Sequence, residues 1–224
     1  QTSAGWFFAD IAINASSGSF QNSYPGAASI IHLRPSGTGD NSAWTGTNTD
    51  IDEITPDEAT TIIVSNTLDQ IEDVNIDDTH VAVSSGATIN VVTVNARFNI
   101  SSATNADPTF VLRVMASSGG TVEESATLSP TATTWFSNQI AAPRTPPIIL
   151  YDLPGASTTA WTKANLDTAQ IGARETLTDT HNVQISTLWM GVDFTSSGSS
   201  TSPSASISPS ASISPSASVS PSAS

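Results

Sequence analysis

The sequence predicts an all-β domain of the sandwich type. Many short segments are rich in Ile, Val, Thr and aromatic residues, and no helical period runs over any length of the chain. Turn formers separate these segments, which is typical of sandwiches built from short strands. With 224 residues, of which 38% are hydrophobic, the chain is long enough for one sizeable core.

The strands are expected, in chain order, at residues 28–33, 61–64, 89–100, 109–115, 147–151 and 182–194. Turn formers mark connections at residues 34–37, 105–108, 117–120 and 153–155. Strand 89–100 alternates most clearly, with apolar residues from Val92 to Ile100 on one face and polar residues such as Asn95 and Asn99 on the other. One face of this strand is therefore predicted to be core and the other solvated.

The last strand contains a change of alternation. Its apolar residues switch parity between Ile185 and Leu188. One extra residue in the strand would restore the alternation, so a β-bulge is predicted near Ser186 and Thr187.

Two sets of motifs occur at the ends of this region. HLRP at 32–35, Trp44, IDE at 51–53 and DEATTII at 57–63 form the first set. YDLP at 151–154, AWTKANL at 160–166, IG at 171–172 and NVQISTLWMGV at 182–192 form the second. They resemble the opening and closing parts of jelly-roll domains in phage virion proteins and in exported bacterial surface or filament proteins. The resemblance implies a jelly-roll β-sandwich and brings no catalytic residues with it.

Composition divides the chain into an N-terminal arm at 1–24, a sandwich body at 25–195 and a tail at 196–224. From Ser202 to Ser224 every even-numbered residue is Ser, and every odd-numbered residue is Pro, Ala, Ile or Val. Such a segment is either a disordered Ser/Pro-rich linker or an extended strand. In an extended strand all apolar side chains would share one face, and the prolines would leave only one edge able to pair.

Both termini are therefore candidates for strand exchange with neighbouring copies. The residues expected to mediate assembly are Trp6, Phe7, Phe8, Ile11 and Ile13 in the arm and Ile207, Ile213 and Val219 in the tail. The alternative for the arm is that it forms the first strand of its own sandwich.

The charge balance excludes some classes of partner. Six basic and twenty acidic residues give a net charge of −14, which disfavours nucleic acid and anionic lipid. No apolar run approaches the ~20 residues of a membrane helix.

The chain has no Cys, which excludes disulfides and thiol chemistry. Its start at Gln1 suits removal of an export leader.

Glycosylation is expected on the exported chain. Asn14 and Asn99 each begin an Asn-x-Ser sequon, and Asn99 falls on the predicted solvated face. The tail offers serines for O-linked glycan at Ser204, Ser206, Ser210, Ser212, Ser216 and Ser218.

Half of the acidic residues lie between positions 50 and 78, where Asp50, Asp52 and Asp57 are candidate calcium ligands. The alternative is that these residues simply solvate surface loops, and no EF-hand spacing is present. A glycosidase carboxylate pair is a further, weaker alternative. No cofactor is otherwise expected, because the three histidines are scattered and no nucleophile motif occurs.

Three tryptophans suggest a second kind of site. Trp44, Trp135 and Trp161 could stack on sugar rings if they share one exposed face, or they could fill the core and the ends of the sandwich. The core prediction is favoured, because a Trp in a small sandwich more often fills the core or closes an end. Thr162 is placed to cap a short helical turn before Leu166, and Trp161 to close one end of the sandwich.

The leading hypothesis is a non-enzymatic structural subunit of an extracellular homopolymeric filament. Its subunits would be joined by strand exchange and would carry glycan on the surface, so its partner is a second copy of itself. Two alternatives remain open: a phage virion or tail-fibre component, and a carbohydrate-binding module on a Ser/Pro linker.

Overall fold

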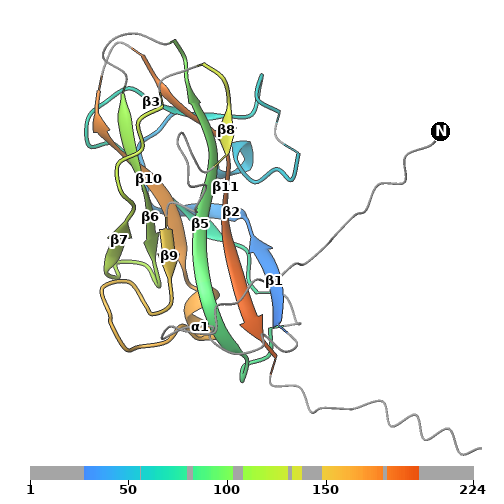
Figure 1. The fold of residues 1–224 in the computed structure, drawn as a ribbon. Helices are drawn as coiled ribbons and strands as arrows, with labels where there is room; N and C mark the ends of the chain where they lie inside the picture. The colour runs from blue at the N-terminus through green and yellow to red at the C-terminus, as the bar shows by residue number, and fades with distance from the viewer. Residues whose placement is uncertain are drawn as a thin grey trace, which may run out of the picture.

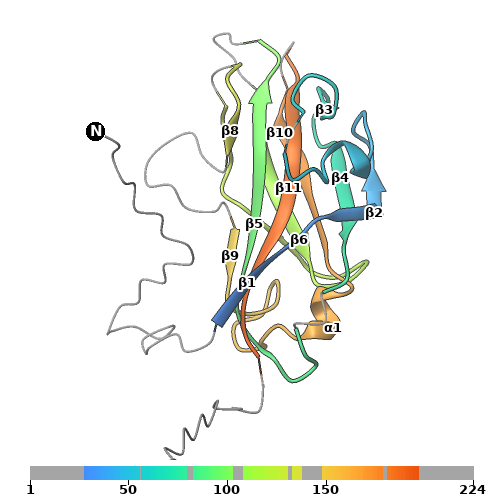
Figure 2. The ribbon, with the colours of Figure 1, turned by 90° about the vertical axis from the view of Figure 1, so that its right-hand side faces the viewer.

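The computed structural model describes residues 28–55, 57–79, 83–102, 108–130, 133–137, 148–178 and 181–196. They form two antiparallel sheets, as the sequence predicts for an all-β sandwich. The long pair of strands β5 (Thr88–Ile100) and β11 (Val183–Thr195) runs the length of the molecule (Figures 1 and 2). The short helix α1 (Lys163–Leu166) lies at one end of this pair, and β3 (Ile63–Ser65) lies toward the other.

Sheet A is built around this pair. Its spatial order is β1 (Ala28–Leu33), β11, β5 and β8 (Phe136–Ser137), with β3 also on β11 and β9 (Ile148–Leu150) also on β5. Sheet B has the order β2 (Pro35–Ser42), β4 (Ile71–Ile76), β10 (Gln170–Leu177), β6 (Thr109–Met115) and β7 (Val122–Glu124). A single 3-10 turn, η1 (Asn48–Asp50), follows β2.

The core lies between the inner faces of the two sheets. The apolar face predicted for β5 is fully buried there, and Phe98 from this strand meets Phe110 from β6 edge to face, with ring centroids 5.0 Å apart. Because β5 belongs to sheet A and β6 to sheet B, this aromatic pair joins the two layers directly.

Several local predictions are confirmed. The register of β5 and β11 shifts between Ile185 and Thr187, where the change of parity predicts a bulge. The Thr162 side chain accepts a hydrogen bond from the Asn165 backbone and caps α1. The turns at 117–120 and 153–155 are closed by backbone hydrogen bonds.

The predicted turn at 34–37 is wrong, because β2 begins at Pro35 and runs through this segment. Pro35 is tolerated because β2 lies at the edge of sheet B, where a missing N–H costs no ladder bond. The predicted turn at 105–108 lies mostly outside the described residues.

The sequence patterns also fail to predict strands β4 and β10. Their inward-facing positions include Glu72 and Glu175, both buried, so their alternation is hidden by acidic residues. The concentration of acidic residues between positions 50 and 78 is therefore only partly a set of solvated loops.

Candidate functional site

The outer face of sheet A presents residues in rows that cross several strands. Cross-strand pairing places His32, Gly191, Thr93 and Ile149 in one such row. Trp189 pairs with Asn95 in the next row. A β-carbon at Gly191 would lie 2.6 Å from the Thr93 hydroxyl oxygen, so a larger residue here would force Thr93 to shift.

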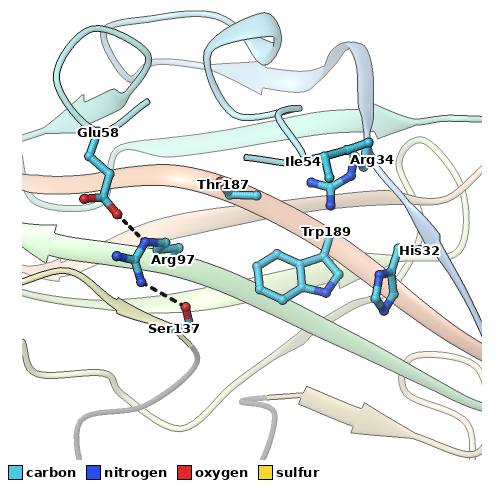
Figure 3. A pocket seen from close by; sticks show the side chains of 8 residues that line it. All are labelled: His32, Arg34, Ile54, Glu58, Arg97, Ser137, Thr187 and Trp189. Carbon is cyan, nitrogen blue, oxygen red and sulfur yellow. Dashed lines mark hydrogen bonds and ion pairs between the residues drawn. The ribbon is translucent and has the colours of Figure 1, made fainter. Parts of the chain in front are cut away.

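A depression of about 430 Å³ opens on this face, and we call it the Trp189 depression (Figure 3). Its size falls within the ~300 to 1,000 Å³ of small-molecule sites. Strands β1, β5, β8 and β11 and the loop after η1 all contribute to its lining, which consists of His32, Arg34, Ile54, Glu58, Arg97, Ser137, Thr187 and Trp189.

On one side of the depression, charges are already paired. Arg97 forms an ion pair with Glu58 and donates a hydrogen bond from Nη1 to the Ser137 hydroxyl at 3.2 Å (Figure 3). These contacts compensate the Arg97 charge and orient its guanidinium along the sheet.

On the other side, Trp189 and His32 present two rings with centroids 6.4 Å apart and planes tilted by 59°. Partial burial, with the nearby Arg34 charge second, holds the pKa of His32 below its ordinary 6.5. The shift favours the neutral imidazole, so His32 contributes mainly an aromatic surface to the depression.

Arg34 stands apart from the other described Lys and Arg residues. It donates from Nη1 to the Glu53 backbone carbonyl and forms no ion pair within the described chain. The others there all pair with carboxylates: Arg97, Arg113, Lys163 and Arg174. The depression therefore holds two guanidinium groups against the single carboxylate of Glu58.

The favoured core prediction is confirmed for two of the three tryptophans, so the three do not share an exposed sugar-binding face. Trp44 and Trp161 are 5% and 2% exposed and belong to the core, while Trp135 is half-buried. The exposed aromatic site instead contains Trp189. Its parity is opposite to that of Leu188 and Met190, which face the core, and this alternation is the signal that places Trp189 outside.

The expectation that Asn99 is exposed is also wrong. Its side chain is 5% exposed, and its Nδ2 donates to the Thr133 carbonyl at 2.9 Å. Because an N-linked glycan is attached through this nitrogen, Asn99 is not available for modification in the folded domain. Asn95 on the same face is equally buried.

The three calcium candidates are not brought together. Asp50 accepts a hydrogen bond from the Thr47 amide at 2.7 Å, and Asp57 accepts from Ala59 and Thr60. The Thr60 hydroxyl and the Ala59 amide hold the pKa of Asp57 below its ordinary value. In the part of the chain that the structure describes, no three carboxylate or imidazole groups, Asp52 included, are arranged to hold a metal ion.

The remaining predicted positions lie outside the described residues, so the structure places none of them. They are the sequon residue Asn14, the arm residues Trp6, Phe7, Phe8, Ile11 and Ile13, and the tail residues Ser204, Ser206, Ile207, Ser210, Ser212, Ile213, Ser216, Ser218 and Val219.

The edges of the two sheets differ in chemistry. Sheet B ends in β2, which is polar and irregular in register against β4, and in β7, which has three residues and two glutamates. Both are features that natural sheets use to block further pairing. Sheet A ends in β1, whose sequence ASIIHL has no proline, no Asp, Glu, Lys or Arg, and an Ile30 that is 63% exposed.

No second strand pairs with β1 among the described residues, so its outer edge is open there. The edge strand β9 on the opposite side of sheet A likewise pairs only with β5 in this part of the chain. An open, uncharged edge is a template for another extended chain.

No protein-family model, curated protein or solved structure matches this chain. The resemblance to jelly-roll domains therefore stays an expectation drawn from the motifs. Across the described ranges, no helix has the length and apolar character that a membrane crossing requires.

Buried carboxylates inside the sandwich form a second polar feature. Glu175 on β10 is fully buried and accepts a hydrogen bond from the Ser65 hydroxyl at 2.5 Å. Burial raises its pKa above the ordinary 4.5, and the hydrogen bond from Ser65 opposes this effect. At pH values between the ordinary pKa and the raised pKa, Glu175 is therefore protonated in the folded state and ionised in the unfolded state.

Replacing Glu175 with Gln is expected to flatten the pH dependence of stability. In the native protein, Glu175 favours folding below about pH 4.5, and this contribution is lost as the pH rises through its raised pKa. In Glu175→Gln, the free energy of unfolding should therefore fall less between pH 4.5 and 7 than it does in the native protein. Urea denaturation of both proteins at several pH values measures this, and Glu123→Gln on the exposed strand β7 is the control. Superimposable pH profiles for native protein and Glu175→Gln would contradict the assignment.

Proposed function

We propose that this chain is a non-enzymatic structural subunit of an extracellular homopolymer. A terminal segment of one copy adds a strand to the open edge of sheet A in the next copy. The observation that carries the proposal is β1, an uncharged and largely apolar edge strand, in a sandwich whose other sheet has both edges blocked.

The candidate donor segments are the arm around residues 6–13 and the alternating tail. Backbone pairing along β1 would supply affinity, and alternate side chains such as Phe8 or Ile213 would supply specificity. A donor from one copy that fills an edge on the next makes a head-to-tail contact, which produces an open polymer rather than a closed dimer. The tail serines would then form a hydroxyl-rich outer surface for glycan, which an intact mass above the sequence mass would test.

The body is proposed to be a jelly roll. The chain passes alternately between the sheets from β1 to β6, and the first and last described strands, β1 and β11, are neighbours in sheet A. This order supports a double-sheet jelly roll, in which Greek-key connections cross the ends of the sandwich. Both chain ends then leave the body near the same edge of sheet A, where a neighbouring copy would be received.

Replacing Ile30 with Lys is expected to abolish polymerisation of the full chain. Ile30 is 63% exposed, so the substitution leaves the core unchanged, and a lysine on an edge strand opposes pairing with another strand. Sedimentation velocity and electron microscopy at matched concentrations should show polymers for the native chain and monomers for Ile30→Lys.

Leu68→Lys is the matched control, since Leu68 is also an exposed aliphatic residue but lies in the turn between β3 and β4. It should polymerise like the native chain. Phe8→Lys and Ile213→Lys identify the donor, because only the variant in the donated segment should remain monomeric. A native chain that stays monomeric at high concentration, or that forms a closed ring or trimer, would refute the head-to-tail assembly.

A further inference from the structure

The Trp189 depression lies on the outer face of sheet A. It combines an aromatic surface with the guanidinium of Arg34, which forms no ion pair within the described residues. We propose that it binds a sugar bearing a carboxylate, that is, a uronic acid unit of an acidic polysaccharide. The proposed ligand lies on the outer face of sheet A, whereas the assembly proposed above uses the backbone edge of β1, the strand that also contributes His32.

Trp189 and His32 supply the aromatic surface of the depression. Figure 3 shows the indole between Arg97 on one side and His32 on the other. Gly191 contributes no side chain to the adjacent row, and the two rings stand at 59° to each other rather than stacked. The indole and imidazole therefore form two walls of an open corner, and the apolar face of a sugar ring fits against such a wall.

Hydrogen-bond donors lie at both ends of the depression. The indole nitrogen of Trp189 forms no hydrogen bond to the described part of the chain. Ser137 and the guanidinium of Arg97 lie at the opposite end of the lining. Convergent polar groups around an aromatic surface are what a ring with several hydroxyl groups requires.

Arg34 supplies the positive charge of the depression. A chain with a net charge of −14 repels anions over most of its surface, so an anion needs a local excess of positive charge. Arg34 supplies that excess, since its only described side-chain partner is the neutral carbonyl of Glu53. A guanidinium offers several N–H donors in one plane, so the groups not used by Glu53 can donate to a carboxylate.

The state of His32 bears on which anionic group the site prefers. Because the pKa of His32 lies below its ordinary 6.5, Arg34 is the main source of unpaired positive charge at the site, and one guanidinium suits a singly charged carboxylate better than a phosphate dianion. The ligand class is therefore a ring with one carboxylate.

The test is calorimetric titration of the full chain with trigalacturonate and, as the matched neutral sugar, galactotriose. Saturable binding of trigalacturonate, weakened by added salt and at least about tenfold stronger than that of galactotriose, is expected. Arg34→Gln should lose about tenfold or more in trigalacturonate affinity while leaving the weak galactotriose binding unchanged. Trp189→Ala should weaken both, and Arg174→Gln on sheet B, which removes the same charge elsewhere, should weaken neither.

A measurement on the native chain avoids dependence on variants that fold poorly. In a spectrum of the ¹⁵N-labelled protein, trigalacturonate should shift the indole N–H signal of Trp189, whereas the buried Trp44 and Trp161 signals stay in place. Equal binding of the two sugars would overturn the role of Arg34. No binding of either, or equal binding of inorganic phosphate, would overturn the site as a uronate site.

Discussion

Replacing Arg113 with Ala is expected to lower the free energy of unfolding by about 3 kcal/mol at pH 7. The Arg113 Nε lies 3.4 Å from Oδ1 of Asp73, and the two side chains are 7% and 0% exposed. Without Arg113, the buried Asp73 carboxylate keeps only its hydrogen bond from Asn41. Chemical denaturation monitored by tryptophan fluorescence measures the loss.

The cost of Arg113→Ala should be smaller at lower pH. Burial raises the pKa of Asp73, and the Arg113 charge opposes this effect, so the variant accepts a proton at Asp73 more readily than the native protein. Once that proton is bound, no unpaired charge remains buried.

Arg174→Ala is the control for Arg113→Ala. Arg174 pairs with Asp69 and Glu124 at a position where its side chain is 27% exposed, against 7% for Arg113, and ion pairs open to solvent contribute less than about 1 kcal/mol. If both variants lose the same small amount at pH 7, the Arg113 and Asp73 pair is not a buried structural link.

Replacing Phe98 with Ala is expected to cost about 3 to 5 kcal/mol. Phe98 is fully buried, and its ring meets that of Phe110 from the opposite sheet at an interplanar angle of 78°. The alanine variant loses this contact and leaves a cavity between the layers that the surrounding strands fill only in part.

Phe136→Ala on β8 is the matched control, because this ring is half-buried at the margin of the core. Its loss should cost clearly less in the same urea titration, with an unchanged denaturant slope. Equal losses at the two positions would mean that the contact between Phe98 and Phe110 does not join the sheets as described.

The sequence patterns locate those strands in which alternation and composition agree. Residues 28–33 and 109–115 match β1 and β6, and the parity change near Ser186 locates the bulge in β11. These features depend only on the two-residue period of an extended chain, which is visible without knowledge of neighbours.

The strands β4 and β10 cannot be recognised in this way. Glu72, Asp73 and Glu175 look like residues of solvated loops in the sequence, yet all three are buried. Their burial is possible because partners far along the chain compensate them: Ser42 and the Trp44 amide for Glu72, Arg113 and Asn41 for Asp73, and Ser65 for Glu175. Local composition does not reveal such partners.

The candidate site is also predicted only in part by the sequence. Alternation in the last strand places Trp189 on the outer face, but its neighbours in the depression extend from His32 to Ser137 along the chain. Composition and periodicity determined an all-β body and the face to which most strand residues point, because these follow from the geometry of one extended chain. Only the pairing of β1, β11, β5 and β8 decided which outward residues lie together, because side chains on separate strands become neighbours through hydrogen bonds between those strands.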